Sequence, residues 1–148
     1  MTRINHSLIY QLLMKVDSDF NPPLSLSLDL DEYSKKIASK AILFTCFNDK
    51  TLIALCAIYT TDNEYLQAYL TLLAVDPAFR GGGVAKKLIS EMEAYVLDAG
   101  FKYVKLEVYK TNVSALSMYR RFGYEIVEES HNSYFLKKSM HHNNIADS

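Results

Sequence analysis

Arg80 is followed by three consecutive glycines, Gly81, Gly82 and Gly83, in a chain that has five glycines in all. Glycines just before a helix let the backbone approach a ligand closely, because no Cβ stands in the way. The unpaired N–H groups of the first helical turn then face that ligand, with the positive end of the helix dipole behind them. The expected ligand is a phosphate or pyrophosphate, and Arg80 adds a positive charge beside it. This stretch therefore predicts a phosphate-binding loop.

The spacing within this loop excludes two common phosphate motifs. A Walker loop needs Gly-x-x-x-x-Gly-Lys-Ser/Thr, which is absent, and the dinucleotide fingerprint Gly-x-Gly-x-x-Gly/Ala fails at Lys86. The pattern that fits is Arg-x-x-Gly-x-Ala, formed by Arg80, Gly83 and Ala85 after Val75-Asp76-Pro77. It resembles the acetyl-CoA pyrophosphate loop of the GNAT family of N-acetyltransferases. A plain strand-turn-helix corner would need one glycine rather than three.

A second motif further along the chain resembles the same family. Its strand-then-helix half reads roughly Leu-x-Val-x-x-x-Asn-x-x-Ala-x-x-x-Tyr-x-x-x-Gly-Phe/Tyr, and Leu106, Asn112, Tyr119 and Gly123 occupy its positions at the right spacing. The resemblance covers about residues 40 to 137. It implies acetyl-CoA as co-substrate and no metal ion. The residues implied to bind acetyl-CoA are Leu73, Ala74, Val75, Arg80, Gly81, Gly82, Gly83, Val84, Ala85 and Asn112.

The family also implies how these motifs would act. The strand that ends at Val75 would bond the amide arm of the cofactor, and a β-bulge in that strand frees its backbone groups. Tyr119 matches the tyrosine beside the cofactor sulfur, where a phenol of pKa ~10 could protonate a leaving thiolate whose thiol has a pKa of ~8.5. Asn112 could instead be only a helix N-cap, and Tyr119 only a core residue.

The base that removes the amine's proton is less clearly marked. Some family members use a glutamate at the place of Gln67, which cannot act as a base. The ribosomal-protein N-terminal acetyltransferases use a glutamate in a Leu-Glu-Val strand, and Glu107 has the matching separation from Tyr119. We therefore predict Glu107 as the base. Two alternatives stay open, a glutamate that only pairs with Lys105 or Lys110, and a water relay without a single base.

Length and composition indicate one globular domain. The chain has 148 residues, of which 49% are apolar and 22% charged, with a net charge of −1. The predicted domain covers residues 1–140, and residues 141–148 form a polar tail. Bulk charge argues against nucleic acid or a membrane surface as partner, and no apolar run approaches the ~20 residues of a membrane span. Without a signal core, and with Cys46 and Cys56 in apolar runs, the expected compartment is the reducing cytoplasm.

Charge is unevenly distributed along the chain. Residues 80–121 carry eight Lys and Arg against four Asp and Glu, whereas residues 1–79 carry six against nine. The basic segment contains the predicted phosphate loop, so a polyanionic ligand such as coenzyme A would be attracted there, although a solvated helix face also gathers lysines.

The rest of the sequence predicts the elements that position these motifs. Helical spacing of apolar residues predicts helices over residues 7–16, 29–40, 84–99 and 113–122, with Gly100 and Gly123 at the ends of the last two. β-Branched and apolar runs predict strands over 41–47, 51–60, 65–75, 102–109, 124–127 and 133–137. No clear strand precedes the first helix. The expected fold is α/β, a GNAT-like central sheet, mixed but mostly antiparallel, flanked by helices.

The acceptor is the least determined part of the prediction. The family places it near the first helix, the loop after it and the last strands, which here include Tyr10, Asp19, Phe20 and Tyr134. A small amine, an amino sugar and a peptide N-terminus all stay open, as does a homodimer. The sequence thus predicts an acetyl-CoA-dependent N-acetyltransferase that acts by direct attack of a primary amine on the thioester. The alternative is a non-catalytic acyl-CoA-binding or regulatory module, which Gln67 and the neutral Gly82 keep open.

Overall fold

The computed structural model describes residues 4–20 and 22–141. In these residues a six-stranded sheet has the order β1-β2-β3-β4-β6-β5, and only the β3–β4 pair is parallel. The mixed, mostly antiparallel sheet is therefore confirmed. The strands are β1 Ile42–Asn48, β2 Thr51–Asp62, β3 Gln67–Val75, β4 Tyr103–Tyr109, β5 Glu125–Glu129 and β6 Ser133–Ser139.

Four α-helices flank the sheet, and their ends follow local capping chemistry. The helices are α1 His6–Val16, α2 Leu30–Lys40, α3 Val84–Asp98 and α4 Val113–Arg121. Asp29 caps α2 by accepting from the N–H groups of Asp31 and Glu32. Gly100 and Gly123 adopt positive φ beyond the ends of α3 and α4, as glycines that end helices do.

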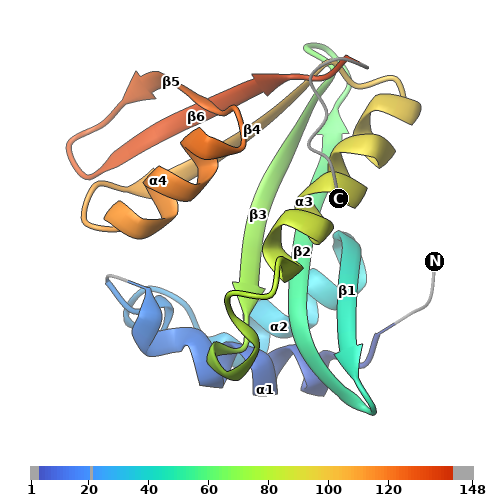
Figure 1. Ribbon diagram of the computed structural model, residues 1–148, viewed down its shortest axis with the longest axis vertical. Coiled ribbons are helices and arrows are strands. Elements are labelled where there is room, and N and C mark those ends of the chain that lie inside the picture. The colour runs from blue at the N-terminus through green and yellow to red at the C-terminus, as the bar shows by residue number, and fades with distance from the viewer. Residues whose placement is uncertain (1–3, 21, 142–148) are drawn as a thin grey trace.

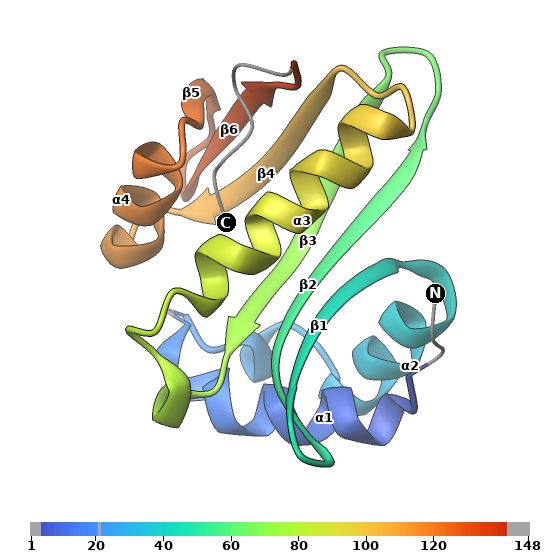
Figure 2. The same ribbon diagram turned by 45° about the vertical axis from the view of Figure 1, so that its right-hand side comes forward.

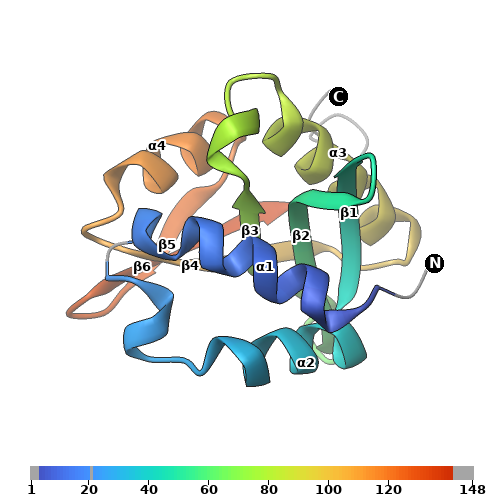
Figure 3. The same ribbon diagram turned by 90° about the horizontal axis from the view of Figure 1, so that it is seen from below.

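The helices form a layer on each face of the sheet (Figure 3). α3 and α4 cover one face, where residues such as Cys56, Leu70 and Met92 form a buried core. α1 and α2 cover the other face, where Leu12 and Ile37 pack against β2 and β3. The second core involves only β1, β2 and β3 of the sheet among the described residues, so β4, β6 and β5 are covered by helices on one face alone.

The sheet opens between its two parallel strands. Backbone pairing of β3 with β4 covers only Gln67 to Tyr69 against Tyr103 to Lys105. Beyond this point the two strands diverge, as Figures 1 and 2 show. The last residues of β3, Leu73 to Val75, therefore have β2 on one side and no strand on the other.

A β-bulge in β3 changes the face of the sheet to which the following side chains point. Ala57 of β2 pairs with Leu72 whereas the next residue, Ile58, pairs with Leu70, so Thr71 is an extra residue in β3. As a result Leu70 faces the core under α3, and Leu72 faces the core under α1 and α2. The Tyr33 hydroxyl of α2 lies 3.3 Å from the Thr71 carbonyl, to which it donates a hydrogen bond. The bulge expected from the family resemblance is present in this strand.

The remaining element predictions agree with the structure to within a few residues. No strand precedes α1 among the described residues, and the loop after it contains two short 3₁₀ turns, Asp17–Asp19 and Leu24–Leu26. The predicted tail is described only at His141, because residues 142–148 lie outside the described residues. No described helix is long and apolar enough to span a bilayer.

Candidate active site

A cleft of about 530 Å³ opens where β3 and β4 diverge, within the size range of ligand pockets. It is bounded by the end of β3, the loop before α3, one side of α4 and the segment after α1. Of the ten residues predicted to bind the cofactor, the cleft brings together nine: Leu73, Ala74, Val75, Arg80, Gly81, Gly83, Val84, Ala85 and Asn112. Gly82 lies in the same loop but does not line the cleft.

The first turn of α3 presents backbone donors that have no partner within the helix. The first bond of α3 runs from Lys87 N to Gly83 O, so the N–H groups of Val84, Ala85 and Lys86 are not used by the helix itself. Gly81 and Gly83 have φ of +86° and +80°, and a Cβ at either would meet no atom within 4 Å. The glycines are therefore required by backbone conformation, and their open side allows a ligand to approach. Such a helix N-terminus favours an anion.

Arg80 has a different environment from the one that the sequence suggested. Its guanidinium folds back on the end of β3, where Nε and Nη2 lie 3.2 and 3.0 Å from the Val75 carbonyl oxygen. Nη2 also lies 2.9 Å from Asp19 Oδ2, in the short 3₁₀ turn after α1. Arg80 thus joins the phosphate loop to the segment between α1 and α2, and its charge is shared with a carboxylate.

Several lining residues were not predicted, namely Lys86, Ser114, Arg121 and the apolar Phe79. Of the residues predicted near the acceptor, Asp19 and Phe20 line the cleft, whereas Tyr10 and Tyr134 do not. Together with Arg80, Lys86 and Arg121 make the charged lining positive, against the single carboxylate of Asp19. The basic segment over residues 80–121 was the sequence signal for Lys86 and Arg121, but it did not identify them individually.

Asn112 stands at the N-terminus of α4, at the wall opposite the glycine loop. Its side-chain oxygen accepts from Ala115 N at 3.4 Å, so it is the N-cap of the helix. It also lines the cleft. The capping role and a position in the cleft are therefore both present.

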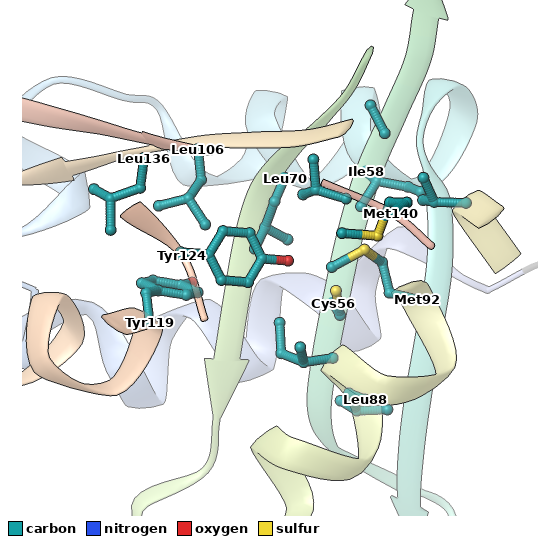
Figure 4. Close-up of a cluster of buried hydrophobic side chains, with 14 of the residues drawn as sticks. Cys56, Ile58, Leu70, Leu88, Met92, Leu106, Tyr119, Tyr124, Leu136 and Met140 are labelled. Atoms are coloured by element: carbon teal, nitrogen blue, oxygen red, sulfur yellow. The ribbon is translucent and has the colours of Figure 1, made fainter. Parts of the chain in front are cut away.

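Tyr119 lies behind the α4 wall and does not line the cleft. It is 7% exposed and belongs to the core under α3 and α4. Its ring meets that of Tyr124 edge-on, with centroids 5.8 Å apart (Figure 4). Burial raises the pKa of Tyr119, and Cys56 raises it further. The phenol is therefore protonated throughout the neutral and mildly alkaline range. Its catalytic role stays a prediction.

Glu107 lies on β4 and is exposed on the face that α3 and α4 leave open. Its Oε2 accepts from the buried Ser133 hydroxyl at 2.7 Å. The predicted alternative, pairing with Lys105 or Lys110, is wrong: these lysines pair with Glu128 and Glu129 of β5. The reason is register, because β6 lies beside β4 and β5 beside β6, so the glutamates of β5 come within reach. Glu107 itself has no ion pair among the described residues.

One aromatic hydroxyl lies near this carboxylate. The pKa of Tyr69 on β3 is raised by burial and then by the charge of Glu107, with smaller contributions from Tyr33 and Tyr109. Tyr69 thus has Glu107 and two further tyrosines, from α2 and β4, in its surroundings. Gln67, at the other possible base position, lies where β3 and β4 are still paired, and neither Gln67 nor Glu107 lines the cleft.

The described residues contain no group of three or more His, Cys, Asp or Glu side chains that could hold a metal ion. Cys46 and Cys56 are free thiols.

Comparison with known proteins identifies a family. Residues 8–124 match the model of the acetyltransferase (GNAT) family. Among curated proteins, an uncharacterized protein of Mycobacterium leprae is 42% identical over 53 residues, which are 36% of this chain and 14% of that protein. The chain therefore spans only a small part of the length of that relative.

Solved structures share the fold over nearly the whole chain. The PaiA N-acetyltransferase of Thermoplasma acidophilum, in complex with coenzyme A, superposes with a TM-score of 0.75 at 14% identity, covering 93% of this chain and 96% of that one. The ribosomal-protein-S18-alanine N-acetyltransferase of Escherichia coli gives 0.74 at 14% identity, covering 94% and 92%. An aminoglycoside 6'-N-acetyltransferase complexed with coenzyme A gives 0.75 at 14% identity, covering 95% and 94%.

Proposed function

This chain belongs to the acetyltransferase (GNAT) family, and on that premise we propose that it is an acetyl-CoA-dependent N-acetyltransferase that acts on a primary amine. The observation that carries the proposal is the cleft between the diverging strands. It gathers nine residues predicted from two separate motifs, and Val84, Ala85 and Lys86, whose N–H groups have no partner within α3, line it and would bind an anion there. Two structural neighbours were solved with coenzyme A, which supports the same co-substrate here.

The cofactor would be held by two kinds of group. The loop N–H groups and the α3 dipole would bind the pyrophosphate, with Lys86 and Arg121 adding positive charge. The free edge of β3 at Leu73 to Val75 would bond the amide arm in the manner of an added strand. When bound, acetyl-CoA supplies an activated thioester carbonyl.

The protein would contribute a base from β4 and a proton donor from α4, two side chains that adjoin the cleft without lining it. An alkyl ammonium has a pKa of ~10.4, so most of the amine arrives protonated and must lose a proton before it attacks. Glu107, which lacks an ion pair among the described residues, is the proposed acceptor of that proton. Tyr119, kept protonated by its burial, is the proposed hydrogen-bond donor to the sulfur as it leaves.

The test is a screen of primary amines for thiol release from acetyl-CoA. Small amines, amino sugars and peptides with free N-termini form its three arms, and the acetylated product is identified by mass. Acetylation in one arm supports the proposal and identifies the acceptor class. Thermal stabilisation by acetyl-CoA without release in any arm would instead support the alternative, an acyl-CoA-binding module.

A further inference from the structure

A buried ion pair lies behind the cleft and is not part of its lining. Glu93 of α3 is fully buried and Lys138 of β6 is 4% exposed. Lys138 Nζ lies 3.0 Å from Glu93 Oε1 and 3.2 Å from Oε2. The buried Tyr124 hydroxyl donates to the same carboxylate at 2.8 Å. Figure 4 shows that this hydroxyl points away from Tyr119, toward the α3 side of the core.

The same ammonium also holds the end of α4. Lys138 Nζ donates to the Phe122 carbonyl at 2.8 Å, and Phe122 is the C-cap of α4. Carbonyls at a helix C-terminus have no partner within the helix, and the dipole favours a cation there. Tyr124 N donates back to the Tyr119 carbonyl at 3.0 Å, with Gly123 at positive φ between them. The Lys138 ammonium is therefore a buried cation that is hydrogen-bonded to the C-cap of α4.

α4 packs against the core mainly through Tyr119, the only residue of the helix that is buried. Ala115, Leu116, Met118 and the cap residue Phe122 are partly buried against the same core. Yet α4 forms a wall of the cleft through Ala115 and Met118. To this packing the edge-on contact of Tyr119 with Tyr124 and the hydrogen bond from Lys138 to the Phe122 carbonyl add contacts of defined direction at the C-terminal end of the helix.

Ion pairs of this kind are a poor source of stability. Desolvation costs several kcal/mol per ion, and apolar residues of similar volume are often neutral or stabilising replacements. What the pair does provide is defined geometry, because each hydrogen bond fixes a partner in place. We propose that Glu93 and Lys138 are positioning residues for acyl transfer: through Tyr124 and the end of α4, they set the position of Tyr119. The inference rests on the proposed function and on the role of Tyr119 in it.

The test removes the network without leaving a buried charge. Lys138→Met alone would leave the Glu93 carboxylate buried without a cation and destabilise the fold. We therefore use the triple variant Glu93→Leu/Tyr124→Phe/Lys138→Met. We expect a folded protein that binds acetyl-CoA within about threefold of wild type. Its kcat should be lower by roughly 10- to 10²-fold, as expected for misplacement of a reacting group. In a Tyr119→Phe background the same three substitutions should lower kcat no further, because their effect acts through Tyr119.

The matched control is Glu91→Leu/Lys137→Met, which changes exposed or half-buried neighbours on the same two elements and should keep wild-type turnover. Wild-type kcat in the folded triple variant would overturn the inference while leaving the proposed function intact. An equal fall in kcat with and without Tyr119 would also overturn it. A wild-type protein that acetylates no amine would remove the proposed function and this inference together.

If the triple variant does not fold, Tyr124→Phe replaces it, because this change keeps the ion pair and removes one hydroxyl. We expect kcat to fall about two- to fivefold, in keeping with a single net hydrogen bond, with an unchanged KM for acetyl-CoA. The fall should be absent in the Tyr119→Phe background. Unchanged kcat in Tyr124→Phe would overturn the inference.

Discussion

The two halves of the sheet differ in how they are covered. β1, β2 and β3 are packed by helices on both faces, and residues 52–58 of β2 are all buried. β4, β6 and β5 have helices on one face only, and every residue of β5 is exposed. The halves are joined by a short parallel pairing at one end. The cleft therefore lies between a half of the sheet that helices cover on both faces and a half that helices cover on one face only.

This difference coincides with a division of proposed roles. Apart from Asn112 and Arg121, the residues proposed to hold acetyl-CoA belong to β3 and the loop and helix that follow it. Glu107 and Tyr119 both belong to the second half. If the comparison holds, changes in the first half alter binding and changes in the second alter turnover. The following predictions test that separation, from the largest expected effect to the smallest.

The sharpest test in the second half is Tyr119→Phe. We expect kcat to fall by ~10²–10⁴-fold while acetyl-CoA binding is unchanged, because only the donor to the leaving sulfur is lost. Steady-state kinetics and thermal shift with acetyl-CoA measure the two effects. The control is Tyr95→Phe, a half-exposed tyrosine on α3. Weaker binding of acetyl-CoA by Tyr119→Phe would show that binding and turnover are not separated between the two halves of the sheet.

The corresponding change in the first half is Gly83→Asp. A carboxylate facing the open side of the loop would oppose the pyrophosphate, and like charges across an interface cost several kcal/mol. We expect acetyl-CoA to bind at least about 10²-fold more weakly, so its thermal stabilisation disappears. Gly100→Asp controls for backbone strain, since Gly100 has φ of +87° at the far end of α3. Equal stabilisation of Gly83→Asp and wild type by acetyl-CoA would contradict the role of the loop.

Glu107→Gln tests the base through its dependence on pH. We expect the rate at pH 7 to fall by about 10- to 10²-fold. The mutant-to-wild-type ratio should then rise between about pH 7 and 9.5, because more of the amine arrives already neutral. The control is Glu125→Gln on the exposed strand β5. A ratio that stays flat over this range would mean that the carboxylate orients the acceptor or supports the strand, and full activity at pH 7 would exclude Glu107 as the base.

Asp19→Asn should have the smallest effect, and it should strengthen the binding of acetyl-CoA. Asp19 forms an ion pair with the Arg80 guanidinium, so removing the carboxylate charge leaves Arg80 free to bind the phosphates. An exposed ion pair contributes up to about 1 kcal/mol, so we expect acetyl-CoA to bind roughly two- to fivefold more tightly. High salt should reduce the difference. Asp31→Asn, which removes a partner of Lys35 on α2, should leave affinity unchanged. Weaker binding in Asp19→Asn would mean that Arg80 acts only when Asp19 holds it.

Most of the fold could be predicted because its signals are local. Asp29 caps α2 through N–H groups two and three residues away, and Gly100 and Gly123 end their helices through their own φ angles. The hairpin between β1 and β2 turns within Asn48-Asp49-Lys50, where Asp49 has a φ of +57°. Such contacts lie within a few residues, so the sequence alone specifies them.

The sequence by itself determined the glycine loop and the helix start behind it, since the first turn of a helix leaves N–H donors without partners in any fold that keeps that helix. Tertiary structure decided the partners of the charged groups. Arg80 meets Asp19 across 61 positions, and Lys138 meets Glu93 across 45. Lys105 and Lys110 pair with glutamates of β5 rather than with Glu107. These pairings follow from strand order and from which face a side chain occupies, and a one-residue change in register, such as the bulge at Thr71, moves a side chain to the other face.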